Sequence, residues 1–430
     1  MDKYNVLLIG GGGREHSIAW KLGQSEKIGK LYSAPGNPGT AQFGENVSLD
    51  VQKFEEIADF VDDKNVELVI IGPEAPLVAG LADFLEEKDI PVFGPKKAAA
   101  MLEGSKEFAK EFMMRHNIPT ADFAVFSSTD YDDALKFIQT KDTYPIVLKA
   151  DGLAAGKGVF ICDNEEEVKQ RLLYIKKDSS LAEAAQRLVV EEFLEGEEAS
   201  VFVISDGHTS HIIHNAQDHK RIGEGDTGLN TGGMGAYSPA PLLTHDLLER
   251  VKKEIIEPTI TGMQLEEKAY FGILYVGLMI TKDGPKVVEY NCRLGDPECQ
   301  AILPSLENDL LELIIAATEQ RLDEKSIQLD NQYRCCVVLA SEGYPGKYEK
   351  GKKITGLNDT DDKAFIFHAG TTENAGDIYT NGGRVLNVVG SGNTLEEAIE
   401  HTYANVEKIN FDGCYYRKDI GAKGLKRIQN

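Results

Sequence analysis

Long apolar runs are missing from this sequence. No stretch approaches the ~20 consecutive apolar residues of a membrane-spanning helix, although 42% of the 430 residues are hydrophobic. The N-terminus enters a strand pattern directly, without the small-residue cleavage site of a signal peptide. The six cysteines form no C-x-x-C pair, and scattered thiols of this kind are typical of reduced, cytosolic proteins. We therefore expect a cytoplasmic protein without a membrane partner.

Positive charge is also scarce. The chain has 46 Lys and Arg against 70 Asp and Glu, which gives a formal charge of −24. This balance argues against nucleic acid or an anionic membrane as a partner. An anionic small substrate must then be held by a few placed cations and by backbone N–H groups. Single Lys and Arg residues in glycine-rich loops are therefore candidates for substrate binding.

The motifs of a protein nucleophile or a zinc hydrolase are absent. The sequence contains no G-x-S-x-G, no H-E-x-x-H and no cysteine with a plausible base. The full dinucleotide fingerprint is missing too, because the third glycine of G-x-G-x-x-G falls on Glu15 or His16 in the stretch "LLIGGGGREHSI". The second strand ends in Ala34 and Pro35 and offers no carboxylate for a ribose. These absences disfavour a nicotinamide dehydrogenase.

The same glycine turn can still bind a lone phosphate. Backbone N–H groups at a helix N-terminus suit an anion, and the guanidinium of Arg14 lies beside this turn. The alternative is a tight turn that only starts a helix.

The length predicts two to four domains. Strand patterns alternate with helical patterns over the first 100 residues, which indicates a parallel sheet with covering helices; the expected strands are 5–10, 30–35, 66–72 and 90–94. From Ser105 onward, hairpins and long helices replace this rhythm, and a smaller αβ unit follows residue 328. We therefore expect a multidomain protein of the α/β and α+β classes, divided into residues 1–104, 105–328 and 329–430.

A second glycine loop, "KADGLAAGKGV", joins two predicted strands over residues 144–162. It is not a P-loop, since Gly158 and Val159 follow Lys157 in place of a hydroxyl residue. A flexible glycine hairpin can nevertheless fold over triphosphate oxygens, and Lys149 precedes it. Surface lysines beside glycine turns are common, so this signal is weak when taken alone.

Lys106 stands in the first turn of a helix that Ser105 is expected to cap. The helix dipole disfavours a cation there by ~0.3–1 kcal/mol. A bound phosphate would offset this penalty; the alternative is a tolerated surface lysine.

The stretch "VVEYNCRLGDPECQ" carries the sharpest local pattern. Glu289 and Asn291 share one face of the predicted strand, with Tyr290 opposite. A carboxylate and an amide oxygen suit Mg²⁺ that carries ATP phosphates. Three charged residues follow in a tight turn, namely Arg293, Asp296 and Glu298. Such dense charge behind an apolar strand is costly unless it is paired or bound to a ligand; a solvated loop is the alternative.

A glycine-rich segment covers residues 215–239. We expect a long loop without regular structure, and such loops usually act as lids or binding loops. It carries five consecutive polar or charged residues, Gln217, Asp218, His219, Lys220 and Arg221. Disorder is the competing interpretation, against which Met234, Tyr237 and the apolar flanks count.

Six motifs, in collinear order from residue 5 to the C-terminal region, resemble the phosphoribosylamine–glycine ligase family of ATP-grasp enzymes. They are "GGGGREHSIAW", "APGNPGT", "GPEAPLVAG", "LKADGLAAGKGV", "QDHKR" and "RLGDPECQ". Each motif alone is moderately specific. The resemblance implies a pre-ATP-grasp domain over 1–104, an ATP-grasp domain over 105–328 with a lid at about 122–192, and a C-terminal αβ domain over 329–430.

The resemblance also implies a reaction. Glycine, ATP and 5-phosphoribosylamine would give glycinamide ribonucleotide, ADP and phosphate through glycyl phosphate, in de novo purine biosynthesis. Mg²⁺ or Mn²⁺ would be the metal, and the protein would be a monomer or weak dimer. Three alternatives stay open: a related purine-pathway ATP-grasp ligase or carboxylase, a nicotinamide oxidoreductase, and a non-catalytic nucleotide-binding regulator.

Site residues carried over from the family fall into four groups. Residues implied to contact ATP are Lys106, Lys149, Gly152, Gly156, Lys157, Gly158, Glu191, Leu194 and Glu198. Residues implied to ligate the metal are Glu289 and Asn291. Residues implied in catalysis are Arg293, Asp296, Asp218 and Lys149. Residues implied to bind the other substrates are Gly11, Gly12, Gly13, Arg14, Asn37, Pro38, Gly72, Pro73, Glu74, Asp218, Lys220 and Arg293.

Overall fold

The computed structural model describes residues 3–127, 129–141, 143–153, 158–177 and 186–429. Within these ranges, no helix combines the length and the apolar character that crossing a bilayer requires. Gly156 and Lys157, two of the predicted ATP-binding residues, lie outside the described residues.

The N-terminal region forms a parallel sheet, as predicted; it has five strands in the order β3-β2-β1-β4-β5, of which β3 was not predicted. Its strands are β1 (Tyr4–Gly10), β2 (Ile28–Pro35), β3 (Glu45–Asn46), β4 (Leu68–Ile71) and β5 (Val92–Phe93). The helices are α1 (Gly13–Leu22), α2 (Phe54–Lys64), α3 (Glu74–Ala79), α4 (Leu81–Glu86) and α5 (Lys97–Gly104). Strand order reverses between β1 and β4, so the loops after these two strands open onto one crevice.

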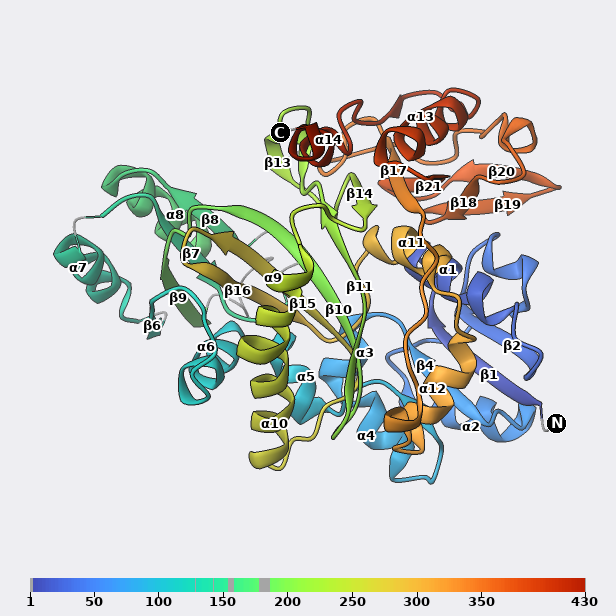
Figure 1. Cartoon of the computed structure of the whole chain (residues 1–430), viewed down its shortest axis with the longest axis horizontal. Coiled ribbons are helices and arrows are strands. Elements are labelled where there is room, and N and C mark those ends of the chain that lie inside the picture. The colour runs from blue at the N-terminus through green and yellow to red at the C-terminus, as the bar shows by residue number, and fades with distance from the viewer. Residues whose placement is uncertain (1–2, 128, 142, 154–157, 178–185, 430) are drawn as a thin grey trace.

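A small antiparallel sheet in the order β6-β9-β7-β8 follows, at the left of Figure 1. Its strands are β6 (Phe123–Ser127), β7 (Ile146–Ala150), β8 (Val159–Cys162) and β9 (Arg187–Glu192). The helices of this region are α6 (Lys106–Arg115), α7 (Tyr131–Lys141) and α8 (Glu165–Lys177). Ile138, Leu148 and Val168 belong to a hydrophobic core whose members, among the described residues, all come from this unit. A unit with its own core can move as a body.

A large sheet holds the rest of the molecule together. Its strands run in the order β16-β15-β10-β11-β14-β17-β21-β18, with β22 paired to β17. The strands are β10 (Glu197–Asp206), β11 (Ser210–Asp218), β14 (Gly235–Ser238), β15 (Phe271–Thr281), β16 (Gly284–Asn291), β17 (Tyr333–Ser341), β18 (Phe365–His368), β21 (Arg384–Gly392) and β22 (Cys414–Tyr415). Pairing of β14 with β17 carries this sheet across the boundary predicted at residue 329.

The helices that flank this sheet are α9 (His245–Val251), α10 (Glu257–Leu265), α11 (Glu298–Ile302), α12 (Leu310–Thr318), α13 (Leu395–Val406) and α14 (Ala422–Gln429). Two further strand pairs lie beside it, β12 (Arg221–Gly223) with β13 (Thr227–Asn230), and β19 (Thr371–Asn374) with β20 (Asp377–Thr380). The expectation of a structureless loop over residues 215–239 is therefore wrong. The segment contains the end of β11, the β12–β13 hairpin and β14.

The N-terminal sheet and the large sheet share their hydrophobic cores. Leu7 and Val69 of the first sheet join Val201 and Val276 of the second in one buried cluster. Apolar burial of this kind contributes about 25 cal/mol per Å², and it fixes the crevice of the first sheet against the end of β16. Helix α1, which follows β1, packs against α11 and α12 (Figure 1).

Candidate active site

Two buried lysines hold one carboxylate at the base of the small sheet. Lys149 Nζ lies 2.9 Å from Glu191 Oε1, and Lys110 Nζ lies 3.0 Å from Glu191 Oε2. Burial lowers the pKa of Lys110 to about 8. Despite the nearby Lys149 ammonium, Glu191 Oε1 accepts no hydrogen bond with good geometry from any described residue. The structure thus brings two predicted ATP-binding residues, Lys149 and Glu191, together as a buried ion pair.

Lys110 was not predicted, although a signal existed. It lies four residues after Lys106 on α6, so the two ammonium groups share one helix face.

Lys106 at the start of α6 is held by hydrogen bonds to the segment that follows β7. Ser105 caps the helix by accepting from Phe108 N, as predicted. Asp151 Oδ1 accepts from the backbone N–H of Lys106 at 2.5 Å, and Lys106 Nζ donates to Gly152 O at 2.8 Å. Burial lowers the pKa of Lys106. This half-buried lysine therefore points at the glycine loop and is not a solvated surface residue.

Glu289 and Asn291 face the same side of β16, as the alternation predicted. Tyr290 points into the opposite core, where its hydroxyl meets Thr259 Oγ1 at 2.7 Å. Burial alone would raise the pKa of Glu289, but nearby cations, above all Lys220, hold it below its usual value. The side chain is thus an ionised carboxylate.

The two oxygen donors suit an ion that takes its other ligands from nucleotide phosphates and water, as Mg²⁺ does. Across the described residues, no group of three or more His, Cys, Asp or Glu side chains could hold a metal by itself.

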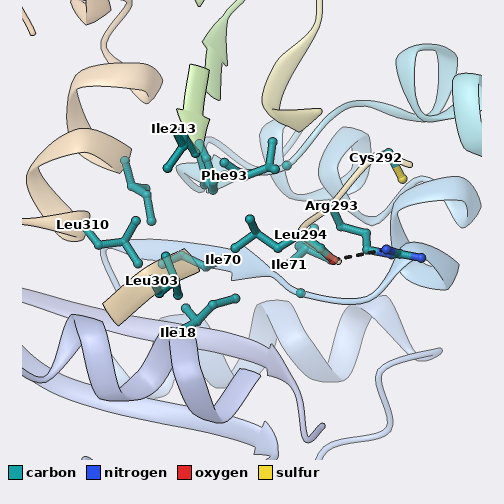
Figure 2. Close-up of a pocket in the computed structure, with 14 residues that line it drawn as sticks. Ile18, Ile70, Ile71, Phe93, Ile213, Cys292, Arg293, Leu294, Leu303 and Leu310 are labelled. Carbon is teal, nitrogen blue, oxygen red and sulfur yellow. Dashed lines mark hydrogen bonds between the residues drawn. The ribbon is translucent and has the colours of Figure 1, made fainter. Parts of the chain in front are cut away.

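Arg293 follows these two residues and turns away from an apolar cavity of about 30 Å³. Figure 2 shows the cavity lined by Ile18, Ile70 and Leu303 on one side, with the guanidinium extending out of it toward the Leu294 carbonyl. The Nη1–O distance is 3.2 Å. An apolar space of this size has room for about one water, so it is too small to hold a substrate.

An acidic pocket lies at the end of β11. Burial raises the pKa of Asp218 to about 7, against the pull of Lys220 and with the help of Glu298. Lys220 Nζ pairs with Glu198 Oε2 at 2.8 Å and lies 3.7 Å from Glu289 Oε1. Carboxylates outnumber the single lysine, so the pocket favours cations. Glu298 stood out in the sequence as a charge but not as a site residue.

The glycine turn after β1 is filled by its own side chains. Gly12 N–H donates to Glu15 Oε2 at 2.7 Å, and Arg14 Nε donates to Glu15 Oε1 at 2.6 Å. Glu15 therefore occupies the place where the dinucleotide fingerprint has a glycine, which explains why the fingerprint fails. Asn37 Nδ2 also bonds Gly11 O and Gly12 O, at 3.0 and 3.2 Å.

This packing bears on the predicted phosphate cradle. The N–H groups of Gly12 and Arg14 are already bonded to Glu15 and Asp296, the latter at a long 3.4 Å. A phosphate at these two positions would have to displace carboxylates. A Cβ added at Gly13 would lie 2.4 Å from Asn387 Nδ2, so the C-terminal region closes over the turn.

The turn after β4 meets the first glycine turn. A Cβ added at Gly72 would lie 2.4 Å from Glu15 Oε1. Pro73 precedes α3, and Glu74 begins it and bonds Arg293 Nε at 3.1 Å. The structure therefore brings the predicted substrate-binding loops to the end of β16, where the predicted metal ligands lie.

Asp296 is held from the C-terminal region by a residue that the sequence did not reveal. Arg384 Nη1 lies 3.4 Å from Asp296 Oδ1 and donates to Asp296 O and Gly232 O, both at 2.6 Å. Arg384 stands 88 positions away in the chain, and no local pattern could have shown the contact.

Comparison with known proteins gives consistent matches over the whole chain. Models of the phosphoribosylglycinamide synthetase N domain, ATP-grasp (A) domain and C domain match residues 4–103, 104–299 and 334–423. The phosphoribosylamine–glycine ligase of Vibrio vulnificus (strain YJ016) is 48% identical over 429 residues, which are 99% of this chain and 99% of that protein.

Solved structures agree. The crystal structure of phosphoribosylamine–glycine ligase from Thermotoga maritima has a TM-score of 0.83 at 36% identity, and the match covers 97% of this chain and 100% of that one. The biotin carboxylase domain of the Hydrogenobacter thermophilus 2-oxoglutarate carboxylase has a TM-score of 0.74 at 16% identity, covering 99% of both chains. The second likeness shows a shared fold alone.

Proposed function

The chain belongs to the phosphoribosylamine–glycine ligase family, and on that premise we propose that it joins glycine to 5-phosphoribosylamine with ATP. The products are glycinamide ribonucleotide, ADP and phosphate, in de novo purine biosynthesis. One observation carries the proposal: Glu289, Asn291 and Arg293 lie close to the ammonium groups of Lys106 and Lys149. Family membership excludes the nicotinamide oxidoreductase considered above.

The proposed chemistry has two steps. A glycine carboxylate oxygen attacks the γ-phosphorus of ATP, the bond to the β-phosphate oxygen breaks, and glycyl phosphate and ADP form. The amine of phosphoribosylamine then attacks the glycyl carbon, which releases phosphate and a proton. Mg²⁺ held by Glu289 and Asn291 would neutralise phosphate charge. Arg293 and Lys149 stabilise negative charge that grows on the transferred group.

The ATP site lies between the small sheet and β16. Lys106 and Lys149 reach the phosphates. Glu191, whose carboxylate pairs with Lys149, begins the segment to Leu194 that we propose borders the adenine. Glu198 holds the ribose, and its carboxylate also pairs with Lys220. The remaining members of this proposed site are Gly152, Gly156, Lys157, Gly158 and Leu194.

Glycine and the amine occupy the two sides of Arg293. The acidic pocket with Asp218 receives the glycine ammonium, and Asp296 orients the amine. Phosphoribosylamine lies in the crevice between the turns after β1 and β4, where Lys220 and Glu74 mark its two ends. The other residues proposed for this crevice are Gly11, Gly12, Gly13, Arg14, Asn37, Pro38, Gly72 and Pro73. Glu15 releases the first turn when the phosphate enters.

The small sheet closes over the reaction. Residues about 122–192 form the proposed lid, and their separate hydrophobic core allows movement as a unit. Closure excludes water, which would otherwise hydrolyse the acyl phosphate. We further propose that the protein works in the cytoplasm as a monomer or weak dimer; light scattering at micromolar concentration tests the assembly.

The deciding experiment measures ADP release from purified protein with phosphoribosylamine and Mg²⁺. We expect ADP only when glycine is present, in equal amount to glycinamide ribonucleotide. Equal ADP release without glycine, or release that requires bicarbonate instead, would contradict the assignment and favour a related ATP-grasp carboxylase.

A further inference from the structure

The guanidinium of Arg293 is held by carboxylates from two other parts of the chain. Glu103 Oε1, in the last turn of α5, accepts from Nη2 at 3.0 Å. Glu74 Oε2, at the start of α3, accepts from Nε at 3.1 Å. The Leu294 carbonyl oxygen accepts a hydrogen bond from Nη1 at 3.2 Å. Every nitrogen of the guanidinium therefore has a partner, which fixes both its position and its plane.

The two carboxylates differ in their surroundings. The side chain of Glu103 is 8% exposed, whereas that of Glu74 is 33% exposed and faces the substrate crevice. Glu74 also lies 3.9 Å from Arg14 Nη1. Glu74 is thus shared between two arginines and open to solvent, whereas Glu103 serves Arg293 from the buried side.

Glu103 also fixes the backbone just after the metal-binding residues. Its second oxygen, Oε2, accepts from the N–H of Cys292 at 2.7 Å and from the Cys292 thiol at 3.1 Å. Cys292 stands between Asn291 and Arg293 in the chain. A single buried carboxylate therefore ties the backbone at position 292 and the side chain at position 293 to α5.

This arrangement has a function beyond packing. The Arg293 side chain rotates about several single bonds, and only one orientation presents it on the polar side of the cavity next to Asn291 Oδ1, 3.4 Å away. Without Glu103, the guanidinium keeps Glu74 as its carboxylate partner and swings toward the crevice. A misplacement of about 1 Å at a reacting group can cost about 10²-fold in rate.

We propose that Glu103 is a positioning residue for catalysis, which holds Arg293 and the backbone of residues 291–293 in the orientation that meets the transferred phosphoryl group. The inference rests on the proposed function, since Arg293 must act at the phosphoryl group. Glu103 itself touches no substrate.

The test is a double-mutant cycle that combines Glu103→Gln with Arg293→Ala. Glutamine keeps the size of the side chain and can still accept from Cys292 N–H, but it loses the charge that holds Arg293. We expect kcat to fall about 10²-fold with the KM for ATP changed less than about 3-fold, because the nucleotide site is untouched. In the Arg293→Ala background, Glu103→Gln should lower kcat no further.

Two controls keep the outcome interpretable. Glu111→Gln on α6 removes a carboxylate that is 48% exposed, and we expect it to leave kcat and the melting temperature unchanged. If Glu103→Gln does not fold, Glu103→Asp retains the charge on a shorter side chain, and the same cycle applies to it. An unchanged kcat in the Glu103 variants, or losses that multiply independently with Arg293→Ala, would overturn the inference.

The proposed function and this inference fail separately. Wild-type protein that shows no glycine-dependent ADP formation would refute the proposed function. Wild-type protein that shows this activity, together with Glu103 variants of full activity, would refute the positioning role alone.

Discussion

At the scale of single residues, Glu289 offers the sharpest test of the metal site. Its side chain is 41% exposed and lies 3.7 Å from Lys220 Nζ. Glu289→Gln should therefore leave the melting temperature within about 1 °C, as exposed substitutions change stability little. It should lower kcat at least about 10²-fold, because an ionised oxygen ligand is lost. Turnover measured over a range of Mg²⁺ concentrations checks both effects.

Chelation provides the matching control. EDTA should abolish wild-type turnover, and added Mg²⁺ or Mn²⁺ should restore it. Wild-type activity of Glu289→Gln at low Mg²⁺ would remove the metal assignment.

Residue alternation explains which parts of this site were predictable. The two-residue period of a strand places Glu289 and Asn291 on one face and Tyr290 on the other. These three neighbouring positions were therefore enough to predict the pair of candidate metal ligands. The partners of Arg293 follow no such period, since Glu103 is 190 positions away. Charge pairing between distant elements is decided by the packing of the sheets, and the sequence alone could not reveal it.

At the scale of elements, the β12–β13 hairpin depends on the C-terminal strand region. Arg417 is 1% exposed, and its guanidinium pairs with Asp226 at 2.9 Å and with Asp419 at 2.7 Å. It also donates to the Arg221 carbonyl at 2.9 Å. The hairpin follows Lys220 directly in the chain. The contacts of Arg417, which we call the clamp, therefore hold the chain in place next to Lys220 and the acidic residues around it.

Arg417→Ala should therefore weaken both the fold and glycine binding. Removing one partner of a buried ion pair typically costs about 3–5 kcal/mol of unfolding free energy, and a loosened hairpin should raise the KM for glycine more than the KM for ATP. Urea unfolding and steady-state kinetics measure the two effects. Arg427→Ala removes an exposed pair with Glu197 and should cost ~0–1 kcal/mol. Equal effects of the two variants would contradict the clamp.

The same hairpin shows where element prediction fails. Strands of the N-terminal sheet and the hairpin of β15 and β16 have strong apolar patterns, and the sequence predicted them to within a few residues. Residues 221–230 have no apolar alternation, and all four residues of β13 are exposed. Contacts with residues 415–419 stabilise this hairpin, so its local sequence indicated only a loop.

At the scale of the whole molecule, two histidines join the first and last parts of the chain. His368 N–H donates to His16 Nδ1 at 2.7 Å, and the His16 ring packs edge-on against Phe367 with a centroid distance of 5.3 Å. Asn37 Nδ2 donates to the His368 carbonyl at 2.8 Å. This contact, which we call the seam, places β18 beside the start of α1, so the C-terminal region supports the glycine turn after β1.

The seam requires neutral imidazoles, which makes it sensitive to acid. Burial lowers the pKa of His16 to about 3, with a contribution from His368, and burial lowers the pKa of His368 to about 4. In the unfolded chain both titrate near 6.5. Below that pH the unfolded state binds more protons than the folded state. The free energy of unfolding is therefore unaffected by the two histidines above about pH 6.5 and falls as the pH drops toward 4. Each histidine contributes a slope of about 1.4 kcal/mol per pH unit within this window.

A variant isolates the contribution of the seam from other titrating groups. His16→Gln keeps a hydrogen-bond acceptor for His368 N–H but cannot be protonated, so its stability should fall less steeply between pH 6.5 and 4 than that of the wild type. Urea unfolding at half-unit pH steps measures the two slopes. Asp218, whose pKa is raised to about 7 by burial, stabilises the fold less as pH rises, and this opposite trend cancels in the comparison. Identical slopes for variant and wild type would show that protonation of His16 does not open the seam. The acid sensitivity would then belong to other buried histidines, namely His368, His214 and His219, whose pKa values burial lowers to about 4.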